Sequence, residues 1–289
     1  MDIRIFSVSD KNPIDILYVQ LNSIKKNKKK DTVIYYDLII EDVDAEVKEY
    51  FNDLVSDDFN INFLDARPYE KYINPPKKSY LYYVRCLAPV IFSGFSKILY
   101  LDTDILMING GIEELWDTDI DNFYLAASLD IEESYRDERE RINVGKNTKN
   151  NNYFNTGVML LNLAKLREYC FIINDYLEHW PEGLECILYD QTLFNWLFKD
   201  NVKIIDSKYN NSILSMAEYD RPYYEKFYNT KNLLIKYKDS CFLHFKGYKI
   251  WNQVPKAIQK RLPYYKLAQI FYLSYYNKLK KQENALNSK

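Results

Sequence analysis

Cysteine, glycine and proline are all scarce in this chain of 289 residues. The four cysteines, Cys86, Cys170, Cys186 and Cys241, are irregularly spaced, form no C-x-x-C pair and sit among apolar neighbours. This argues against a zinc cluster and predicts reduced packing residues. With only 7 Gly and 9 Pro against 47% hydrophobic residues, the chain is neither fibrous nor disordered. It is long enough to bury the core of one large α/β domain or two small ones.

Long apolar runs are also missing. No stretch of about 18 uncharged apolar residues occurs, and the first residues, MDIRIFSVSDKN, lack the basic segment and apolar core of a signal peptide. We therefore expect a cytoplasmic location. The net charge is −2, so a surface that is basic throughout is absent and nucleic acid is not an expected partner.

Short apolar segments alternate along the chain with segments of helical periodicity. This alternation predicts an α/β fold with a mostly parallel central sheet. The predicted strands cover residues 3–8, 32–40, 60–64, 98–101, 123–129, 153–163, 202–205 and 241–245, and the predicted helices cover residues 14–24, 43–51, 79–92, 112–116, 166–180 and 187–198. Segments 130–152 and 216–231 show neither periodicity nor motif. The first is long for a loop in a compact domain, which predicts either a disordered excursion or a functional lid.

The stretch KILYLDTDIL, residues 97–106, organises the rest of the chain. A strand predicted to be buried on both faces ends there at Asp102 and Asp104. Ligands of α/β sheets collect at the carboxyl ends of strands, and two carboxylates held together there need a positive partner. A divalent cation is the usual partner, so the pair predicts a metal site for an anionic substrate. The alternative is a pair of solvated acids where the chain returns to water.

Polar residues also gather at the ends of three later predicted elements. They are Asn155, Thr156 and Gly157, which lead into strand 153–163; Asp190 and Gln191, in the first turns of helix 187–198; and His244, Gly247 and Lys249, at and after the last strand. Glycine permits a close approach of the backbone to a ligand, and imidazole is a common metal ligand. Taken singly, each group also has an ordinary explanation as a turn or a structural histidine.

The order of these motifs, D-x-D, then N-T-G-V, then D-Q, then H-x-x-G-x-K-x-W, resembles the family 8 glycosyltransferases, which include bacterial lipopolysaccharide galactosyl- and glucosyltransferases and glycogenin. The resemblance runs from the first strand through Trp251 and is strongest in KILYLDTDILMINGGIEELWDTD and YFNTGVMLLNL. It implies a GT-A-type, Rossmann-like single domain, which we assign to residues 1–255. It also implies transfer of glucose or galactose from UDP-glucose or UDP-galactose to a glycan, glycolipid or glycoprotein, in the biosynthesis of lipopolysaccharide or another cell-surface glycan.

The resemblance further implies a role for each matching residue. The metal ligands would be Asp102, Asp104 and His244, with Mn²⁺ as the expected ion and Mg²⁺ as the alternative. The donor UDP-sugar would be bound by Val8, Asp10, Asn12, Arg85, Asp102, Thr103, Asp130, Asn155, Thr156, Gly157, Gly247 and Lys249. The catalytic position near the anomeric carbon matches Gln191, which implies front-face attack with retention of configuration. Asp190 is the neighbouring carboxylate that would serve instead.

Two segments depart from the family pattern. The family usually has H-x-x-G-x-x-K-P-W, whereas HFKGYKIW is one residue shorter before Lys249 and has Ile250 in place of proline. The family often has D-Q-D, whereas this chain has Thr192 at the third position, so no role is given to an acid there. Two other functions stay open at this point. One is an inactive nucleotide- or glycan-binding module of the same fold, and the other is a nucleotidyltransferase, which also uses paired aspartates.

The last segment, residues 256–289, differs in charge from the rest. It holds eight basic residues and one acidic residue, whereas residues 1–255 hold 31 basic and 40 acidic residues. Apolar and aromatic residues recur among its lysines, which predicts an amphipathic helical tail. We expect the tail to lie on an anionic membrane surface, peripherally on the inner face of the plasma membrane. The alternative is a helix that packs on the domain with its lysines in water.

Overall fold

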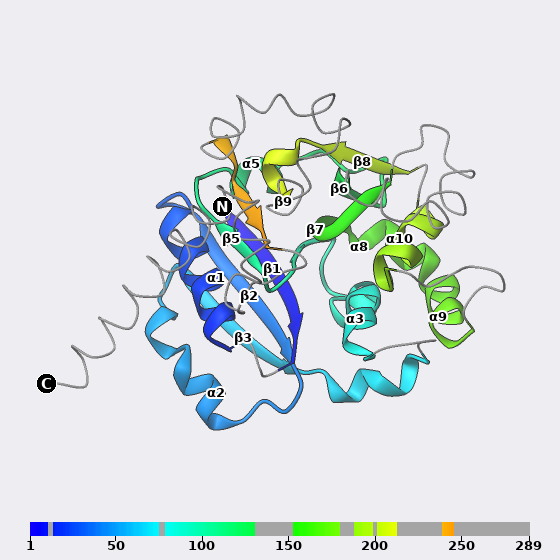
Figure 1. Ribbon diagram of the computed structural model, residues 1–289, viewed down its shortest axis with the longest axis horizontal. Coiled ribbons are helices and arrows are strands. Elements are labelled where there is room, and N and C mark those ends of the chain that lie inside the picture. Colours follow the sequence, from blue (N-terminus) through cyan, green and yellow to red (C-terminus); the bar gives the residue numbers. More distant parts are fainter. Residues whose placement is uncertain are drawn as a thin grey trace, which may run out of the picture.

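The computed structural model describes residues 1–10, 14–74, 79–130, 153–179, 188–198, 201–212 and 239–245. A central sheet with helices on both faces dominates it (Figure 1). The seven strands of this sheet are ordered β3-β2-β1-β4-β7-β6-β8. Their bounds are Asp2–Ser9 (β1), Val33–Ile40 (β2), Phe59–Asp65 (β3), Lys97–Leu101 (β4), Leu125–Leu129 (β6), Phe154–Asn162 (β7) and Val202–Ile205 (β8).

One strand, β7, runs against the others. It pairs antiparallel with β4 and with β6, whereas β1 with β2, β2 with β3, β1 with β4 and β6 with β8 all pair in parallel. The predicted mostly parallel α/β sheet is therefore confirmed. The reversal has a consequence for function, because it places the first residues of β7 at the edge where β4 and β6 end.

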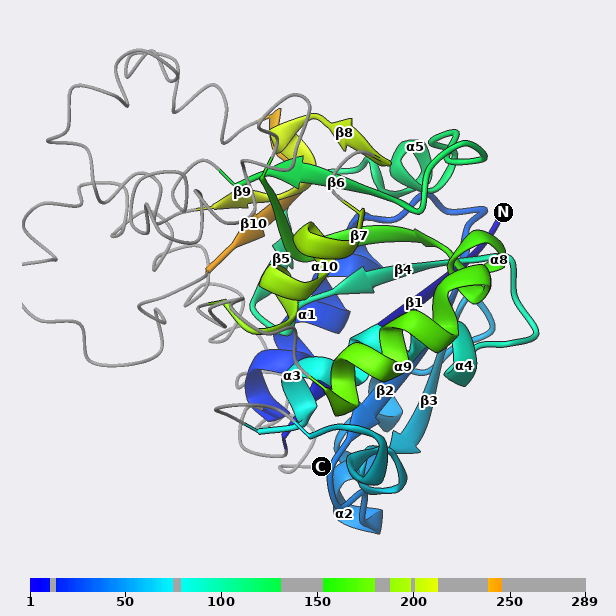
Figure 2. The ribbon, with the colours of Figure 1, turned by 90° about the vertical axis from the view of Figure 1, so that its right-hand side faces the viewer.

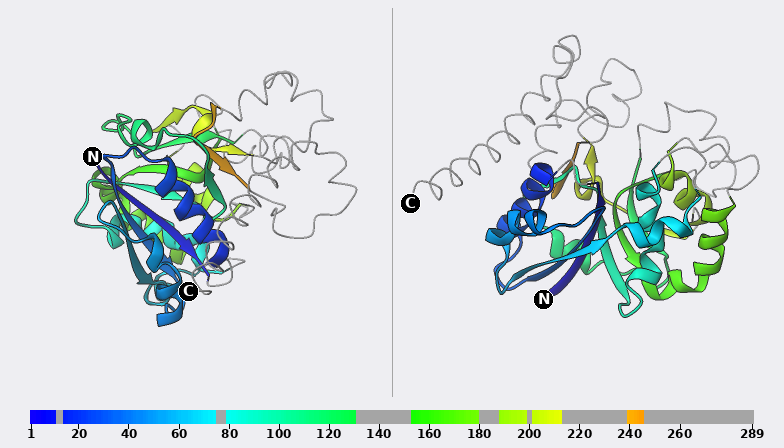
Figure 3. Two further views of the ribbon diagram at one scale, coloured as in Figure 1. Left: turned by 90° about the vertical axis from the view of Figure 1, so that its left-hand side faces the viewer. Right: turned by 90° about the horizontal axis from the view of Figure 1, so that it is seen from below.

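Helices cover both faces of the sheet, as Figures 2 and 3 show from two sides. One face carries α1 (Ile14–Asn27), α2 (Ala45–Tyr50) and α5 (Ile112–Trp116), and the other carries α3 (Leu81–Val84), α4 (Ala88–Ile91), α8 (Leu163–Leu166), α9 (Cys170–Glu178) and α10 (Asp190–Phe198). Strand β4 contributes Ile98 and Tyr100 to one core and Leu99 and Leu101 to the other. The strand is thus buried on both faces, as its unbroken apolar run predicted.

A second, three-stranded sheet holds the last described residues. Its strands are ordered β5-β10-β9, with bounds Ile105–Met107 (β5), Phe242–His244 (β10) and Asn211–Ser212 (β9). The sequence analysis did not predict β5, because a three-residue apolar run after an acidic pair has no periodicity of its own. Strand β10 pairs antiparallel with β5, which brings His244 opposite Ile105, next to Asp104.

The helix predicted over residues 79–92 is not continuous. It is divided into α3, the 3₁₀ turn Arg85–Leu87 and α4. Pro89 explains the division, since proline lacks an N–H and its ring clashes with the carbonyl four residues earlier, here that of Arg85. The helix predicted over residues 166–180 is likewise divided by the 3₁₀ turn Arg167–Tyr169, where the ring of Tyr169 packs on Tyr124 with centroids 4.9 Å apart.

Several predictions fall outside the described residues. They concern segments 131–152 and 216–231, Asn12, Gly247, Lys249 and the tail 256–289. Within the described part of the chain, Cys86, Cys170 and Cys241 are free, as expected. None of the helices in that part is both long and apolar enough to cross a membrane.

Candidate active site

The site lies at one edge of the main sheet, where four elements begin or end. Asp102 follows β4, Asp130 follows β6, Asn155 lies at the beginning of β7 and Asp190 is the first residue of α10. The backbone N–H of Asp102 donates to the carbonyl of Gly157 (2.7 Å), which joins β4 to β7 at this edge. The topology therefore brings together polar groups that are far apart in the sequence.

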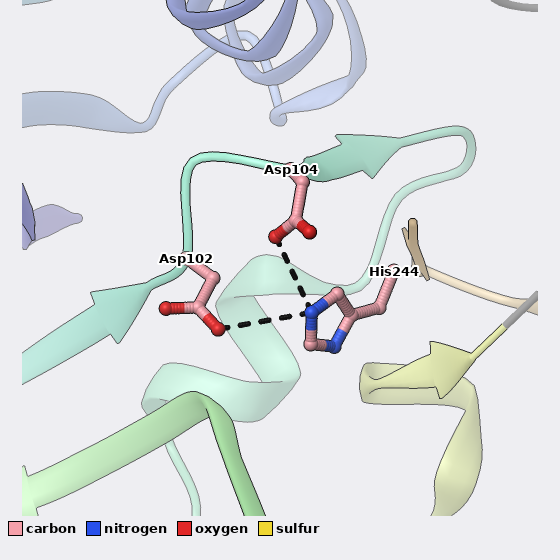
Figure 4. Close-up of side chains that lie close together, drawn as sticks. All are labelled: Asp102, Asp104 and His244. Carbon is pink, nitrogen blue, oxygen red and sulfur yellow. Dashed lines mark ion pairs between the residues drawn. The ribbon is translucent and has the colours of Figure 1, made fainter. Parts of the chain in front are cut away.

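Asp102, Asp104 and His244 point toward one another from β4, the following turn and β10 (Figure 4). His244 Nε2 lies 3.3 Å from Asp104 Oδ1 and 3.7 Å from Asp102 Oδ2. One ligand atom from each residue lies within 4.8 Å of the others. The N–H of Phe245 donates to the carbonyl of Asp104 (2.9 Å), which fastens the end of β10 to the acidic turn.

The donor set of this cluster fits a divalent cation. Two carboxylates and one imidazole suit Mn²⁺, and Mg²⁺ is compatible with the oxygen ligands. Asp104 is 7% exposed and His244 is 2% exposed, so the carboxylate of Asp104 is not simply returning to water. The alternative of solvated acids is therefore not supported.

Asp102 is held by its neighbours through one oxygen. Tyr100 donates its hydroxyl to Asp102 Oδ1 (2.6 Å), and Arg85 Nη1 lies 2.8 Å from the same atom. Gln20 donates to the Asp102 carbonyl (2.6 Å). These contacts fix the side chain so that Oδ2 is the oxygen directed at His244. Arg85 is one of the predicted donor-binding residues, whereas Tyr100 and Gln20 carry no motif of their own and were not predicted.

Arg85 also contacts Asp190 and so links the metal cluster to α10. Its Nη1 lies 3.4 Å from Asp190 Oδ2, and both side chains are buried. Although burial opposes it, the two carboxylates of Asp102 and Asp190 raise the pKa of Arg85 above its ordinary value. Burial, reinforced by the charge of Asp102 and opposed by Arg85, raises the pKa of Asp190 to about 6.

A network of buried hydrogen bonds occupies the centre of the site. Asn155 Nδ2 donates to Asp130 Oδ2 (2.9 Å) and to Gln191 Oε1 (3.1 Å), while Gln191 Nε2 donates to Asp130 Oδ2 (3.1 Å). The Thr156 N–H donates to Gln191 Oε1 (3.1 Å), and its hydroxyl donates to Asp190 Oδ2 (3.1 Å). Such mutual bonding fixes the side chains before a ligand arrives.

Gly157 is required by the ring of His244. A Cβ at position 157 would lie 2.3 Å from His244 Cε1 and 2.8 Å from Nδ1. The sequence analysis expected the backbone of Gly157 to approach a ligand. The structure shows that the glycine makes room for the imidazole of His244.

Asn210 is a residue of this site that the sequence analysis missed. It precedes β9 and contacts His244 Nδ1 through Oδ1 (2.8 Å) and Asn155 Oδ1 through Nδ2 (2.7 Å). Its only sequence signal is the pair Asn210 and Asn211, just before and at the start of β9, and paired asparagines are also common in turns without function.

Three further predicted donor-binding residues are described by their place in the fold. Val8 is buried in β1, Asp10 is exposed just after that strand, and Thr103 is half-buried between the two aspartates. Asp10 and Thr103 lie at the sheet edge that carries the site, because β1 pairs in parallel with β4. Thr192 is fully buried and accepts a hydrogen bond from the Leu188 N–H (3.1 Å), a structural role at the start of α10.

An α/β sheet of this topology, with a D-x-D pair and a histidine at one edge, is the arrangement expected of a GT-A-type glycosyltransferase. The family model for Glycosyl transferase family 8 matches residues 4–254, and the chain belongs to this family. It is a glycosyltransferase, as the motif order implied.

Among known proteins, a Haemophilus influenzae protein with a provisional glycosyltransferase designation is 29% identical over 257 residues, which cover 86% of this chain and 72% of that protein. A lipopolysaccharide 1,2-glucosyltransferase of Escherichia coli is 26% identical over 241 residues, with 79% of this chain and 67% of the relative covered. Glycosyltransferase GlyF of Streptococcus pneumoniae is 30% identical over 148 residues, but these cover only 51% of this chain and 33% of that protein.

Solved structures show the same fold. The galactosyltransferase LgtC, crystallised with donor and acceptor sugar analogues, superposes with a TM-score of 0.72 at 23% identity and 96% coverage of both chains. The glycosyltransferase GlyE of Streptococcus pneumoniae superposes with a TM-score of 0.62 at 20% identity, covering 95% of this chain and 64% of GlyE. The GT-A-like fold is therefore confirmed.

Proposed function

We propose that this glycosyltransferase moves a hexose, glucose or galactose, from a UDP-sugar to a glycan, glycolipid or glycoprotein, with a divalent metal ion and with retention of configuration. The observation that carries the proposal is the metal-ligand cluster Asp102, Asp104 and His244, joined through Arg85 and Asn210 to a buried polar network. The names of two similar proteins, a lipopolysaccharide 1,2-glucosyltransferase and a galactosyltransferase, support the two hexoses.

Asp102, Asp104 and His244 would hold the ion, Mn²⁺ or Mg²⁺. When bound, it would stabilise the negative charge that develops on the departing diphosphate. Arg85 contacts Asp102 Oδ1, which leaves Oδ2 of the same carboxylate directed at the ion. Lys249 and Gly247 are proposed to hold the diphosphate, and Val8, Asp10 and Asn12 the uridine, on the resemblance to the family alone.

The sugar is proposed to bind over Asp130, Asn155, Thr156 and Gln191. Their amide, hydroxyl and carboxylate groups are hydrogen-bonded to one another and buried, so they are already oriented for the hydroxyls of one hexose. A site built from oriented polar groups rejects sugars that leave those groups unpaired. The specificity for the hexose would therefore reside in this network.

Retention is proposed to occur by front-face attack beside Gln191. The carboxylate that would otherwise act as nucleophile, Asp190, accepts from Thr156 and contacts Arg85 through the same Oδ2 atom. These contacts hold the oxygen that would attack, which makes Asp190 a poor nucleophile. This favours an ion-pair route in which the amide oxygen of Gln191 faces the anomeric carbon.

Product analysis tests this proposal. The protein is incubated with Mn²⁺, candidate acceptors and either UDP-glucose or UDP-galactose, and released UDP is measured. We expect turnover with one of the two donors and an NMR coupling constant that shows the donor's anomeric configuration in the product. An inverted product would overturn retention, and an absence of UDP release with both donors would overturn the choice of donor.

We further propose that residues 256–289 bring the enzyme to an anionic membrane surface. The proposal rests on the charge of this segment, eight basic residues against one acidic residue. Cosedimentation with anionic vesicles, for chains with and without residues 256–289, tests it. Equal binding by the two chains would refute it.

A further inference from the structure

We propose that Asn210 is the positioning residue that sets the tautomer of His244, and that it thereby couples the sugar-binding network to the metal site. The inference rests on the metal site of the proposed function. Its basis is a continuous chain of hydrogen bonds from a backbone N–H to the imidazole, through Gly157, Asn155, Asn210 and His244.

The direction of each bond follows from the first. The backbone N–H of Gly157 contacts an Asn155 side-chain atom at 2.8 Å, and a backbone N–H only donates, so that atom is the carbonyl oxygen Oδ1. The atom of Asn210 that contacts this oxygen at 2.7 Å must also donate, so it is the amide nitrogen. The carbonyl oxygen of Asn210 therefore faces His244.

An oxygen 2.8 Å from His244 Nδ1 accepts only if Nδ1 carries the hydrogen. The lone pair of the neutral ring then lies on Nε2, which is the atom directed at Asp102 and Asp104. In the other tautomer, the lone pair of Nδ1 would face a lone pair of Asn210 Oδ1 at 2.8 Å. No water would relieve this repulsion readily, because His244 is 2% exposed. Asn210 thus presents the ligand atom of His244 in the form that binds a metal.

The side-chain amide of Asn210 links the proposed sugar-binding network to the proposed metal site. Asn155 Nδ2 donates to Asp130 and Gln191, so the orientation of Asn155 that suits the sugar network also fixes Asn210. A change in the sugar network would reach His244 through Asn210. Asp190 and Arg85 form a separate link, which reaches the metal cluster through Asp102.

The tautomer is measured on the metal-free protein. The chain has only 2 histidines, so few ring signals need to be assigned. The full chain is labelled with ¹⁵N-histidine, freed of metal with EDTA and recorded at alkaline pH. A His179→Gln variant assigns the signals. We expect wild-type His244 to carry its hydrogen on Nδ1. In Asn210→Leu the hydrogen should move to Nε2, toward Asp104, and Mn²⁺ affinity measured by calorimetry should fall by about 10–100-fold.

Two further variants separate positioning from general damage. Asn210→Asp keeps an acceptor for Nδ1, so it should retain the wild-type tautomer. Its second oxygen would face the acceptor Asn155 Oδ1, so its Mn²⁺ affinity should lie between those of wild type and Asn210→Leu. Asn211→Leu makes the same change one residue later, where the side chain bonds Ser240 instead of the site, and should change neither quantity. The proposal is overturned if Asn210→Leu keeps the wild-type tautomer, or if its Mn²⁺ affinity equals that of wild type. Failure of the wild-type chain to bind Mn²⁺ would instead refute the metal site and the proposed function.

Discussion

Replacing Gly157 by alanine tests whether the position of the proposed metal ligand His244 depends on the glycine of β7 that its ring contacts. The added Cβ would lie 2.3 Å from His244 Cε1, whereas ordinary contact begins at 3.4 Å, so the ring must move by about 1 Å. The ring has little room, because Nδ1 is bonded to Asn210 and the side chain is 2% exposed. Ligand distances in a metal site tolerate only about 0.2 Å.

We therefore expect Gly157→Ala to lower Mn²⁺ affinity by about 10–100-fold, which is about 1.4–2.7 kcal/mol. The overpacking should also lower the free energy of unfolding by about 1–3 kcal/mol. Calorimetric titration of EDTA-treated protein with Mn²⁺ measures the first quantity and urea denaturation the second. Gly94→Ala is the matched control, because no atom lies within 4 Å of a Cβ at that position. Wild-type affinity in Gly157→Ala would show that the ring of His244 is not held against this glycine.

Three further substitutions test the charges and amides of the site. The folded-state pKa of Asp190 is about 6, above its ordinary 3.8, so the wild-type free energy of unfolding should fall as pH rises from about 4 to about 6. Relative to Asp190→Asn, the free energy of unfolding should fall by about 3 kcal/mol in EDTA. If the free energies of unfolding of the two proteins instead change in parallel with pH, the burial of this charge is contradicted. Arg85→Met leaves Asp102 and Asp190 without their shared cation. Urea denaturation in EDTA should therefore show a free energy of unfolding lower by about 3 kcal/mol. A decrease below about 1 kcal/mol would mean that water already screens these charges. Gln191→Glu replaces the amide that donates to Asp130 by a second carboxylate about 3.1 Å away. We therefore expect kcat at pH 7.5 to fall at least about tenfold. An unchanged kcat would show that Gln191 has no part in the proposed reaction.

Much of the fold was predictable from periodicity. The β1, β2, β3, β4, β6, β7, β8 and β10 strands all fall within a few residues of their predicted bounds, because buried strands are apolar and their turns are polar. Strand direction was not predictable, since the sequence of β7 has the same apolar run whether it lies parallel or antiparallel. The break at Arg85 was in principle predictable from Pro89.

The site was predictable only where a motif carried it. Asp102, Asp104 and His244 were identified together through the order of family motifs, and the structure brings them within reach of one ion. Asn210 was not identified, because its role depends on which atoms its amide faces, and no spacing in the sequence encodes that. Tyr100 was predicted only as part of a buried strand, and its ring is indeed buried. Only the structure shows that its hydroxyl donates a hydrogen bond to Asp102.

The most direct test of the account is the metal dependence of UDP release in wild type and in Asp104→Asn. EDTA-treated wild-type enzyme should release UDP from UDP-glucose or UDP-galactose only when Mn²⁺ is added, with a rate that saturates as the ion fills the site. Asp104→Asn keeps the size of the side chain but loses the charge of a ligand, so its rate should stay at background over the same Mn²⁺ range while its circular dichroism spectrum matches wild type. Full turnover by wild type in EDTA, or by Asp104→Asn with Mn²⁺, would contradict the proposed metal site at the carboxyl end of β4.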